Sequence, residues 1–100
     1  MSLTHCIQAL GNERRLQILE WLKDPERHFP PQRDGDLVKD GVCGLLIARK
    51  LHVSQPAVTE HLKILSRAGF LTSKRTKKWI FYKRREPAIT AIKRAISQRI

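Results

Sequence analysis

Residues 45–65, near the middle of the chain, constrain the fold most, because two helical patterns are separated there by a strong helix start. Ser54 can accept hydrogen bonds from the free N–H groups of the second helix. Pro56 falls in the first turn of that helix, where its missing N–H costs little. The two helices share a small apolar seam of Ala48, Leu51, Val53, Val58, Leu62 and Leu65. We therefore expect a helix, a tight turn and a second helix over residues 44–67.

The outward face of the second helix is almost entirely polar. It carries Gln55, Ala57, Thr59, Glu60, His61 and Lys63. This layout is typical of a helix-turn-helix, whose second helix lies in the major groove of DNA with its N-terminal residues at the base edges. The segment therefore predicts double-stranded DNA as the partner.

The distribution of charge points to the same partner. The chain carries a net charge of +11. Residues 1–60 hold eight basic and eight acidic residues, whereas residues 61–100 hold twelve basic residues and one acid, Glu86. By itself this excess would equally suit a solvated basic surface that binds any polyanion. Beside a helix-turn-helix, it predicts contact with nucleic-acid phosphates.

Residues 71–84 follow the second helix and have the pattern of a β-hairpin. The strands are expected at 71–76 and 78–84, with Lys77 and Lys78 near the tip and alternation visible over residues 79–82. The basic side chains around the tip of this hairpin are Lys74, Arg75, Lys77 and Lys78. We expect a wing that lays cations on the phosphate backbone or in the minor groove. The alternative, an aromatic platform for single strands, is less favoured because such aromatics usually anchor a hairpin to the helices beneath.

The remaining segments complete one winged helix-turn-helix domain over residues 1–100, mainly α with a small β-hairpin. Further helices are expected at residues 2–10, about 13–23 and 87–99. The last helix carries an apolar stripe of Ile89, Ile92, Ile96 and Ile100. We expect the helices at 2–10 and 87–99 to form a homodimer, because a helix-turn-helix that binds two half-sites needs a twofold partner.

Residues 24–42 interrupt the helical pattern and are predicted to be a loop insertion. Two adjacent prolines and two Asp-Gly steps indicate turns, with room for a short extended piece at Leu37-Val38. Asp34, Asp36 and Asp40 lack the ligand spacing and closing Glu of an EF-hand. We therefore expect solvated turn residues here rather than a calcium site.

Four blocks of the chain, residues 9–19, 51–65, 68–71 and 79–82, resemble the motifs of ArsR-type (arsenical-resistance-repressor-like) winged-helix regulators in their order. The resemblance implies a homodimeric repressor that occupies a near-palindromic operator and leaves when an effector binds. By position, it places Ser54, Gln55, Ala57, Thr59 and His61 toward the major groove, and the four basic residues at 74–78 on the wing. His52 departs from the usual turn glycine, although histidine tolerates a left-handed backbone better than most residues.

The chain departs most from the family pattern at the residues that would bind an effector. Metal-sensing members carry a cysteine pair at the start of the third helix, but here Leu45 stands where the second cysteine would follow Cys43. The last helix has no His, Asp or Cys, so the family's other metal site is absent. A closed site needs three or four ligands, and one protomer offers Cys6, Cys43 and His5. Three roles for the two thiols stay open: small buried side chains, an oxidation or persulfide switch, and a metalloid site.

Other function classes find little support. No nucleophile has a plausible base, no glycine-rich phosphate loop occurs and no cofactor is indicated, so an enzyme is not expected. No apolar run is long enough to span a membrane, and the first residues lack a signal-peptide pattern, which favours the cytoplasm. The sequence thus predicts a sequence-specific DNA-binding regulator. The alternative is a basic architectural or RNA-binding module that does not read sequence.

Overall fold

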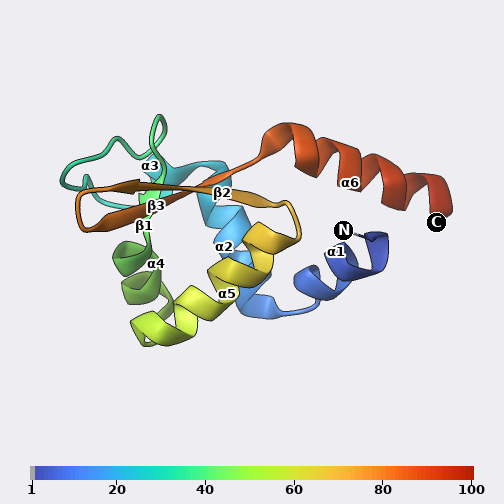
Figure 1. Ribbon diagram of the computed structural model, residues 1–100, viewed down its shortest axis with the longest axis horizontal. Coiled ribbons are helices and arrows are strands. Elements are labelled where there is room, and N and C mark those ends of the chain that lie inside the picture. The colour runs from blue at the N-terminus through green and yellow to red at the C-terminus, as the bar shows by residue number, and fades with distance from the viewer. Residues whose placement is uncertain (1) are drawn as a thin grey trace.

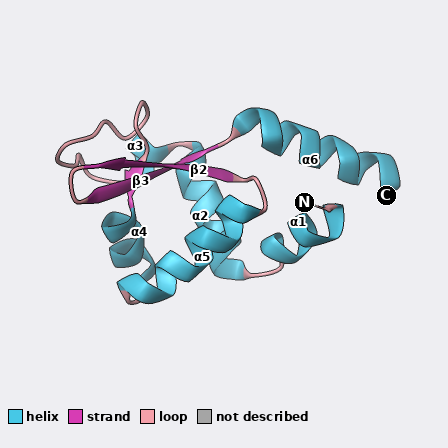
Figure 2. Ribbon diagram, in the orientation of Figure 1, coloured by secondary structure: helices cyan, strands magenta, loops and turns pink. Residues whose placement is uncertain are grey.

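The computed structural model describes residues 2–100, which form a helical domain with one small sheet (Figures 1 and 2). In chain order the elements are α1 (Leu3–Leu10), α2 (Glu13–Lys23), α3 (Pro25–His28), β1 (Val42–Cys43), α4 (Gly44–Leu51), α5 (Gln55–Arg67), β2 (Leu71–Thr76), β3 (Trp79–Arg84) and α6 (Glu86–Arg99). The sheet and residues 29–41 lie at one end of the long axis. Helix α1 and the C-terminal half of α6 lie at the other end (Figure 1).

Three helices begin where a polar side chain replaces the missing hydrogen-bond partner of the first turn. The Ser2 hydroxyl accepts from the backbone N–H of His5, and the Asn12 side chain accepts from that of Arg15. Ser54 Oγ accepts from the backbone N–H of Ala57 at 3.3 Å, which confirms the predicted cap of α5.

The turn between α4 and α5 closes on a left-handed residue, His52, with φ 57° and ψ 41°. Its N–H donates to the carbonyl of Arg49, and the next N–H, from Val53, donates to that of Ala48, each at 3.2 Å. These bonds satisfy carbonyls that the end of α4 would otherwise leave free. Histidine therefore occupies the glycine position of this turn, as expected.

The sheet is antiparallel with strand order β1-β3-β2, so the predicted hairpin is confirmed and a third strand joins it. Strand β1 pairs Val42 with Tyr82 and Cys43 with Phe81. The extended piece expected at Leu37-Val38 was wrong, because that segment lies in a turn. The close approach of the chain to β3 requires Gly41, which has φ 106° and where an added Cβ would lie 2.5 Å from the Tyr82 carbonyl oxygen.

The core is built around the inward face of α5. Val58, Leu62 and Leu65 are at most 1 % exposed. They pack among fully buried residues of other elements, including Ile18 of α2, Ile47 of α4 and Val42 of β1. This burial sets the rotation of α5 and thereby determines which of its side chains face solvent.

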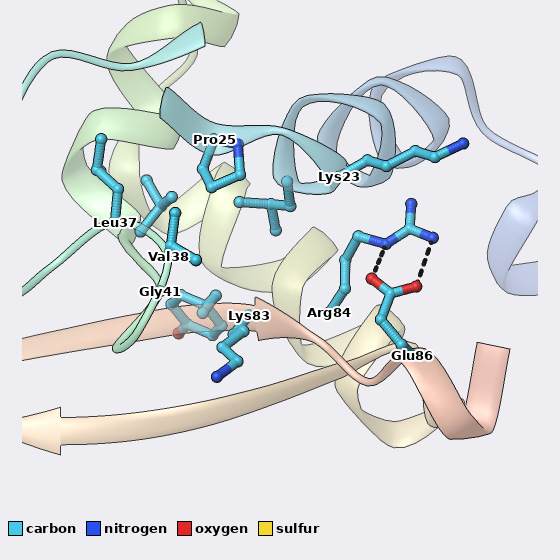
Figure 3. Close-up of a pocket in the computed structure, with 11 residues that line it drawn as sticks. Lys23, Pro25, Leu37, Val38, Gly41, Lys83, Arg84 and Glu86 are labelled. Atoms are coloured by element: carbon cyan, nitrogen blue, oxygen red, sulfur yellow. Dashed lines mark hydrogen bonds and ion pairs between the residues drawn. The ribbon is translucent and has the colours of Figure 1, made fainter. Parts of the chain in front are cut away.

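Arg84 links three elements at the far end of β3. Its side chain is largely buried and donates to the Leu19 carbonyl of α2 at 3.0 Å. The same guanidinium makes two hydrogen bonds to the Glu86 carboxylate, at 2.8 and 3.1 Å, at the start of α6 (Figure 3). This bidentate pair holds the first turn of α6 against the sheet.

Over residues 2–100, none of the helices has the length and apolar character needed to cross a bilayer.

Candidate nucleic-acid interface

The first two turns of α5 present polar side chains to solvent. Gln55, Glu60 and Lys63 are exposed, whereas Ala57 and Thr59 are half-buried at the edges of the same face. A shallow hollow on this face is lined by Gln55, Pro56, Thr59, Glu60 and Lys63. Ser54, the cap, is also exposed. Most of the side chains that the sequence predicts to contact DNA bases therefore lie together in the N-terminal part of one helix.

His61 lies at the margin of this face of α5, where it meets Arg15 of α2. Its ring is half-buried, and Nδ1 lies 3.3 Å from Arg15 Nη1, which can only donate. Arg15 also donates from Nε to the Ala9 carbonyl at 2.6 Å, so it holds the end of α1 against α2 and α5. Burial is the main cause that lowers the pKa of His61, and the charges of Arg15 and Arg14 lower it further. A DNA contact by His61 stays a prediction.

The lowered pKa of His61 predicts that the fold loses stability in mild acid. The unfolded imidazole, with a pKa near 6.5, binds a proton more tightly than the folded one. Stability that is present above about pH 6.5 is therefore lost as the pH falls through the lower folded pKa. Melting temperatures of the wild type and of His61→Gln, taken from about pH 7.5 to 5, test this. We expect a shallower fall for the variant, and equal slopes would contradict the assignment.

The wing places its cations around the turn between β2 and β3. Lys74, Arg75, Lys77 and Lys78 are all exposed. Lys77 Nζ lies 3.0 Å from Asp34 Oδ1, and Lys74 Nζ lies 2.9 Å from Asp40 Oδ1. Among residues 2–100, Arg75 and Lys78 form no ion pair. Of these four cations near the tip, two are already paired with carboxylates and two are not.

Residues 29–41, here called the clasp, lie against the wing and pair two of their aspartates with wing lysines. The hydrogen bond from Lys77 is the largest cause that lowers the pKa of Asp34. For Asp40 the backbone N–H of Asp36 is the largest cause of a lowered pKa, and Lys74 adds to it. Asp34 and Asp40 are thus turn residues, as expected, and each also pairs with a lysine of the wing. Exposed ion pairs contribute little to stability, so DNA phosphates can compete for both lysines.

The clasp also covers one face of the sheet. An added Cβ at Gly35 would lie 2.8 Å from the Phe81 ring, and Phe81 is 1 % exposed. Trp79 Nε1 donates to Asp34 Oδ2 at 3.2 Å, and Lys78 Nζ lies 5.1 Å from the centroid of the indole ring. Because Phe81 is buried and Trp79 is bonded to Asp34, the pair does not form a two-ring platform on which successive bases of a single strand could stack.

The two cysteines are free thiols in different parts of the protomer. Cys6 is buried on α1, and its Sγ lies 3.5 Å from the carbonyl oxygen of Ala68 after α5. Cys43 is 7 % exposed in β1, directly before α4, and its N–H donates to Gln32 Oε1 of the clasp at 3.0 Å. His5 bonds to the Ser2 hydroxyl on the exposed side of α1. Within residues 2–100 no three potential metal ligands of the His, Cys, Asp and Glu types come together.

Sequence reasoning missed the clasp and its anchor, Gln32. The Gln32 side chain donates to the Gly41 carbonyl at 2.6 Å while it accepts from Cys43, so it bridges both sides of the bend before β1. The available signal was the opposite charge of the loop aspartates and the wing lysines. Pairing between residues 34 or more positions apart, however, carries no periodicity that a sequence pattern would show.

Comparisons with known proteins agree with this geometry. A sequence profile described as "Bacterial regulatory protein, arsR family" matches residues 43–73, which span α4, α5 and the start of β2. The HTH-type transcriptional regulator YbzH of Bacillus subtilis (strain 168) is 48 % identical over 82 residues, which is 82 % of this chain and 82 % of that protein.

Solved structures share the fold. The ArsR family transcriptional regulator RHA00566 aligns with a TM-score of 0.73 at 14 % identity, over 97 % of this chain and 90 % of that one. The homodimeric winged helix-turn-helix DNA-binding domain of Mb0332 from Mycobacterium bovis aligns with a TM-score of 0.66 at 21 % identity, over 95 % and 73 % of the two chains. The capped α5, the wing and the identity to the Bacillus regulator lead to one conclusion: the chain belongs to the ArsR family of bacterial regulatory proteins and is a winged helix-turn-helix transcriptional regulator, not an enzyme.

Proposed function

We propose that this regulator is a cytoplasmic, homodimeric repressor that binds a near-palindromic operator and is released by an effector or by thiol oxidation. The observation that carries the proposal is the first turn of α5, which is capped by Ser54, exposed at Gln55, and backed by side chains that are at most 1 % exposed. A rigid, exposed helix start of this kind reads base edges in the major groove. In this assignment Ser54, Gln55, Ala57, Thr59, His61 and Lys63 face the groove.

The wing would supply the affinity that does not depend on sequence. Lys74, Arg75, Lys77 and Lys78 would bind phosphates, because exposed cations release counterions from the duplex when they do so. The exchange of Asp34 and Asp40 for phosphate frees the two paired lysines during binding. The excess of eleven positive charges within residues 61–100 supports the same role.

A twofold dimer would place two copies of α5 in successive major grooves. Apolar side chains at the α1–α6 end support such a dimer. Ile7 is 46 % exposed and Ile100 is 97 % exposed. A shallow hollow between the two helices is lined by Leu3, Thr4, Ile7, Ile96, Arg99 and Ile100. The homodimeric neighbour from Mycobacterium bovis supports the same assembly.

The experiment that tests the proposal is binding to DNA fragments around the protein's own gene, with reduced and oxidised protein compared at one fixed salt concentration. Tight binding to one near-palindromic site is the expected result. Loss of that binding on oxidation and its return with reductant would assign Cys6 and Cys43 as the switch. Equal binding of both forms would leave them as buried side chains. No preference for any fragment would support the alternative, a basic architectural or RNA-binding module.

Gln55→Ala is expected to relax sequence preference. A glutamine amide at a base edge supplies about 1–3 kcal/mol of discrimination, so the ratio of operator to scrambled-duplex affinity should fall roughly 5- to 150-fold. Fluorescence anisotropy with both duplexes measures this ratio. If Gln55→Ala lowers both affinities by the same factor, the side chain does not read bases.

Arg75→Ala is the matched control on the wing. It should weaken binding to both duplexes equally and lower the slope of log affinity against log salt by about one. Lys77→Ala should lower the slope less, because Lys77 already gives up an ion pair with Asp34 when it meets DNA.

A further inference from the structure

A cavity of ≈ 410 Å³ lies between residues 31–33 of the clasp, the start of α4 and the tip of the wing. Its walls combine cationic and apolar side chains from all three segments. The residues that decide its chemistry are Arg33, Leu45, Leu46, Arg49, Lys78 and Trp79. Cavities of this size are large enough to enclose much of a small organic molecule.

The charged residues that line the cavity are all cations. Arg33 comes from the clasp, Arg49 from α4 and Lys78 from the wing, and no aspartate or glutamate lines the wall. Within the described chain, residues 2–100, none of these three side chains takes part in an ion pair. The nearby Asp34 carboxylate is already bonded to Lys77 and Trp79 and is not part of the wall, so the three cations of the wall share like charge without a partner there. An anion placed among them would relieve their mutual repulsion.

The apolar part of the cavity wall is formed by Trp79, Leu45 and Leu46. The indole of Trp79 is held by its hydrogen bond to Asp34, and Leu45 and Leu46 are half-buried on the first turn of α4. A flat ring beside an indole gains contact area at little entropic cost. A DNA phosphate would use the three cations but would leave the indole and the two leucines without a partner.

We propose that this cavity binds a small organic anion with an aromatic body. The carboxylate or similar head group would lie among Arg33, Arg49 and Lys78, where guanidinium groups can form paired hydrogen bonds. The ring would pack against Trp79 and the leucines. The anion would also compete with DNA, because Lys78 cannot serve both at once, and this second part rests on the proposed function.

Binding is tested first without DNA, with 2-naphthoate as the probe and the uncharged 2-naphthamide as its matched control. Calorimetry measures affinity, and the indole N–H resonance of Trp79 reports the location, with Trp21 as the internal reference. We expect naphthoate to bind, to shift Trp79 and not Trp21, and to bind about tenfold or more tightly than the amide. Arg33→Gln and Arg49→Gln should each weaken naphthoate to a similar extent, whereas Arg94→Gln on α6 should not.

Absence of naphthoate binding, equal affinity for the amide, or a shift at Trp21 instead of Trp79 would overturn the site. If Arg33→Gln and Arg49→Gln weaken DNA binding while naphthoate does not bind, the cavity is a phosphate contact. Competition is tested separately by operator binding at saturating naphthoate, where a weaker complex is expected. Unchanged operator affinity would overturn the competition and leave the site standing, and failure to bind any operator would overturn the proposed function alone.

Discussion

Leu62→Ala should reduce the free energy of unfolding by about 2–5 kcal/mol, which is among the largest effects that one substitution can have on this chain. Leu62 is 1 % exposed and packs within the core cluster that joins the helices to the sheet. Removal of its isobutyl group leaves a cavity that rigid neighbours on several elements cannot close. Chemical denaturation, followed by far-UV circular dichroism, measures the change in the midpoint.

Glu60→Ala, two residues away on the same helix, is the matched control. Glu60 is exposed and forms no ion pair within residues 2–100. The free energy of unfolding of this variant should therefore differ from that of the wild type by no more than about 0.5 kcal/mol. If both variants lose the same stability, the loss comes from the helix as a whole and not from the core contact of Leu62.

Ile7→Glu is the second substitution for which we expect a large effect, and the quantity it changes is the stability of the dimer. Because Ile7 is 46 % exposed in the protomer, the glutamate costs the folded monomer little. In the proposed dimer the same carboxylate would be buried without a partner, once in each protomer. We expect the dimer dissociation constant to rise by about two orders of magnitude or more, and operator affinity to fall with it. Analytical ultracentrifugation and anisotropy measure the two quantities.

Gln98→Glu makes the same change of charge near the far end of α6, at an exposed position away from the apolar stripe. It should leave the dimer intact. A dimeric Ile7→Glu protein would show that another surface joins the protomers. A monomeric protein that keeps full operator affinity would remove the dimer from the binding mechanism.

Local patterns predicted much of the fold because their causes are local. Ser54 caps α5 through a bond to a residue three positions ahead, and His52 takes a left-handed conformation that its own side chain tolerates. The apolar seam of α4 and α5 follows from helical spacing, and the strands of the wing follow from alternation around a two-residue turn. Each of these features involves residues that are close in the chain, so a single sequence carries the whole signal.

That His61 also contacts Arg15 was not predictable in the same way. Helical spacing places it at the margin of the outward face, and either side of that margin satisfies the pattern. The contact with Arg15, 46 positions earlier, drew the ring toward α2. Arg15 stands near the start of α2, and its guanidinium satisfies the last carbonyls of α1.

The sequence alone determined the helix-turn-helix, the wing and the basic C-terminal part, because helix caps, hydrophobic periodicity and net charge are properties of neighbouring residues. Only the tertiary structure decided that residues 29–41 clasp the wing through Asp34 and Asp40, that β1 joins the sheet, and that Arg33, Arg49 and Lys78 surround one cavity. Those arrangements depend on the path of an irregular loop. That path is set by distant contacts such as Gly35 on Phe81 and Gln32 between Gly41 and Cys43, for which no local pattern exists.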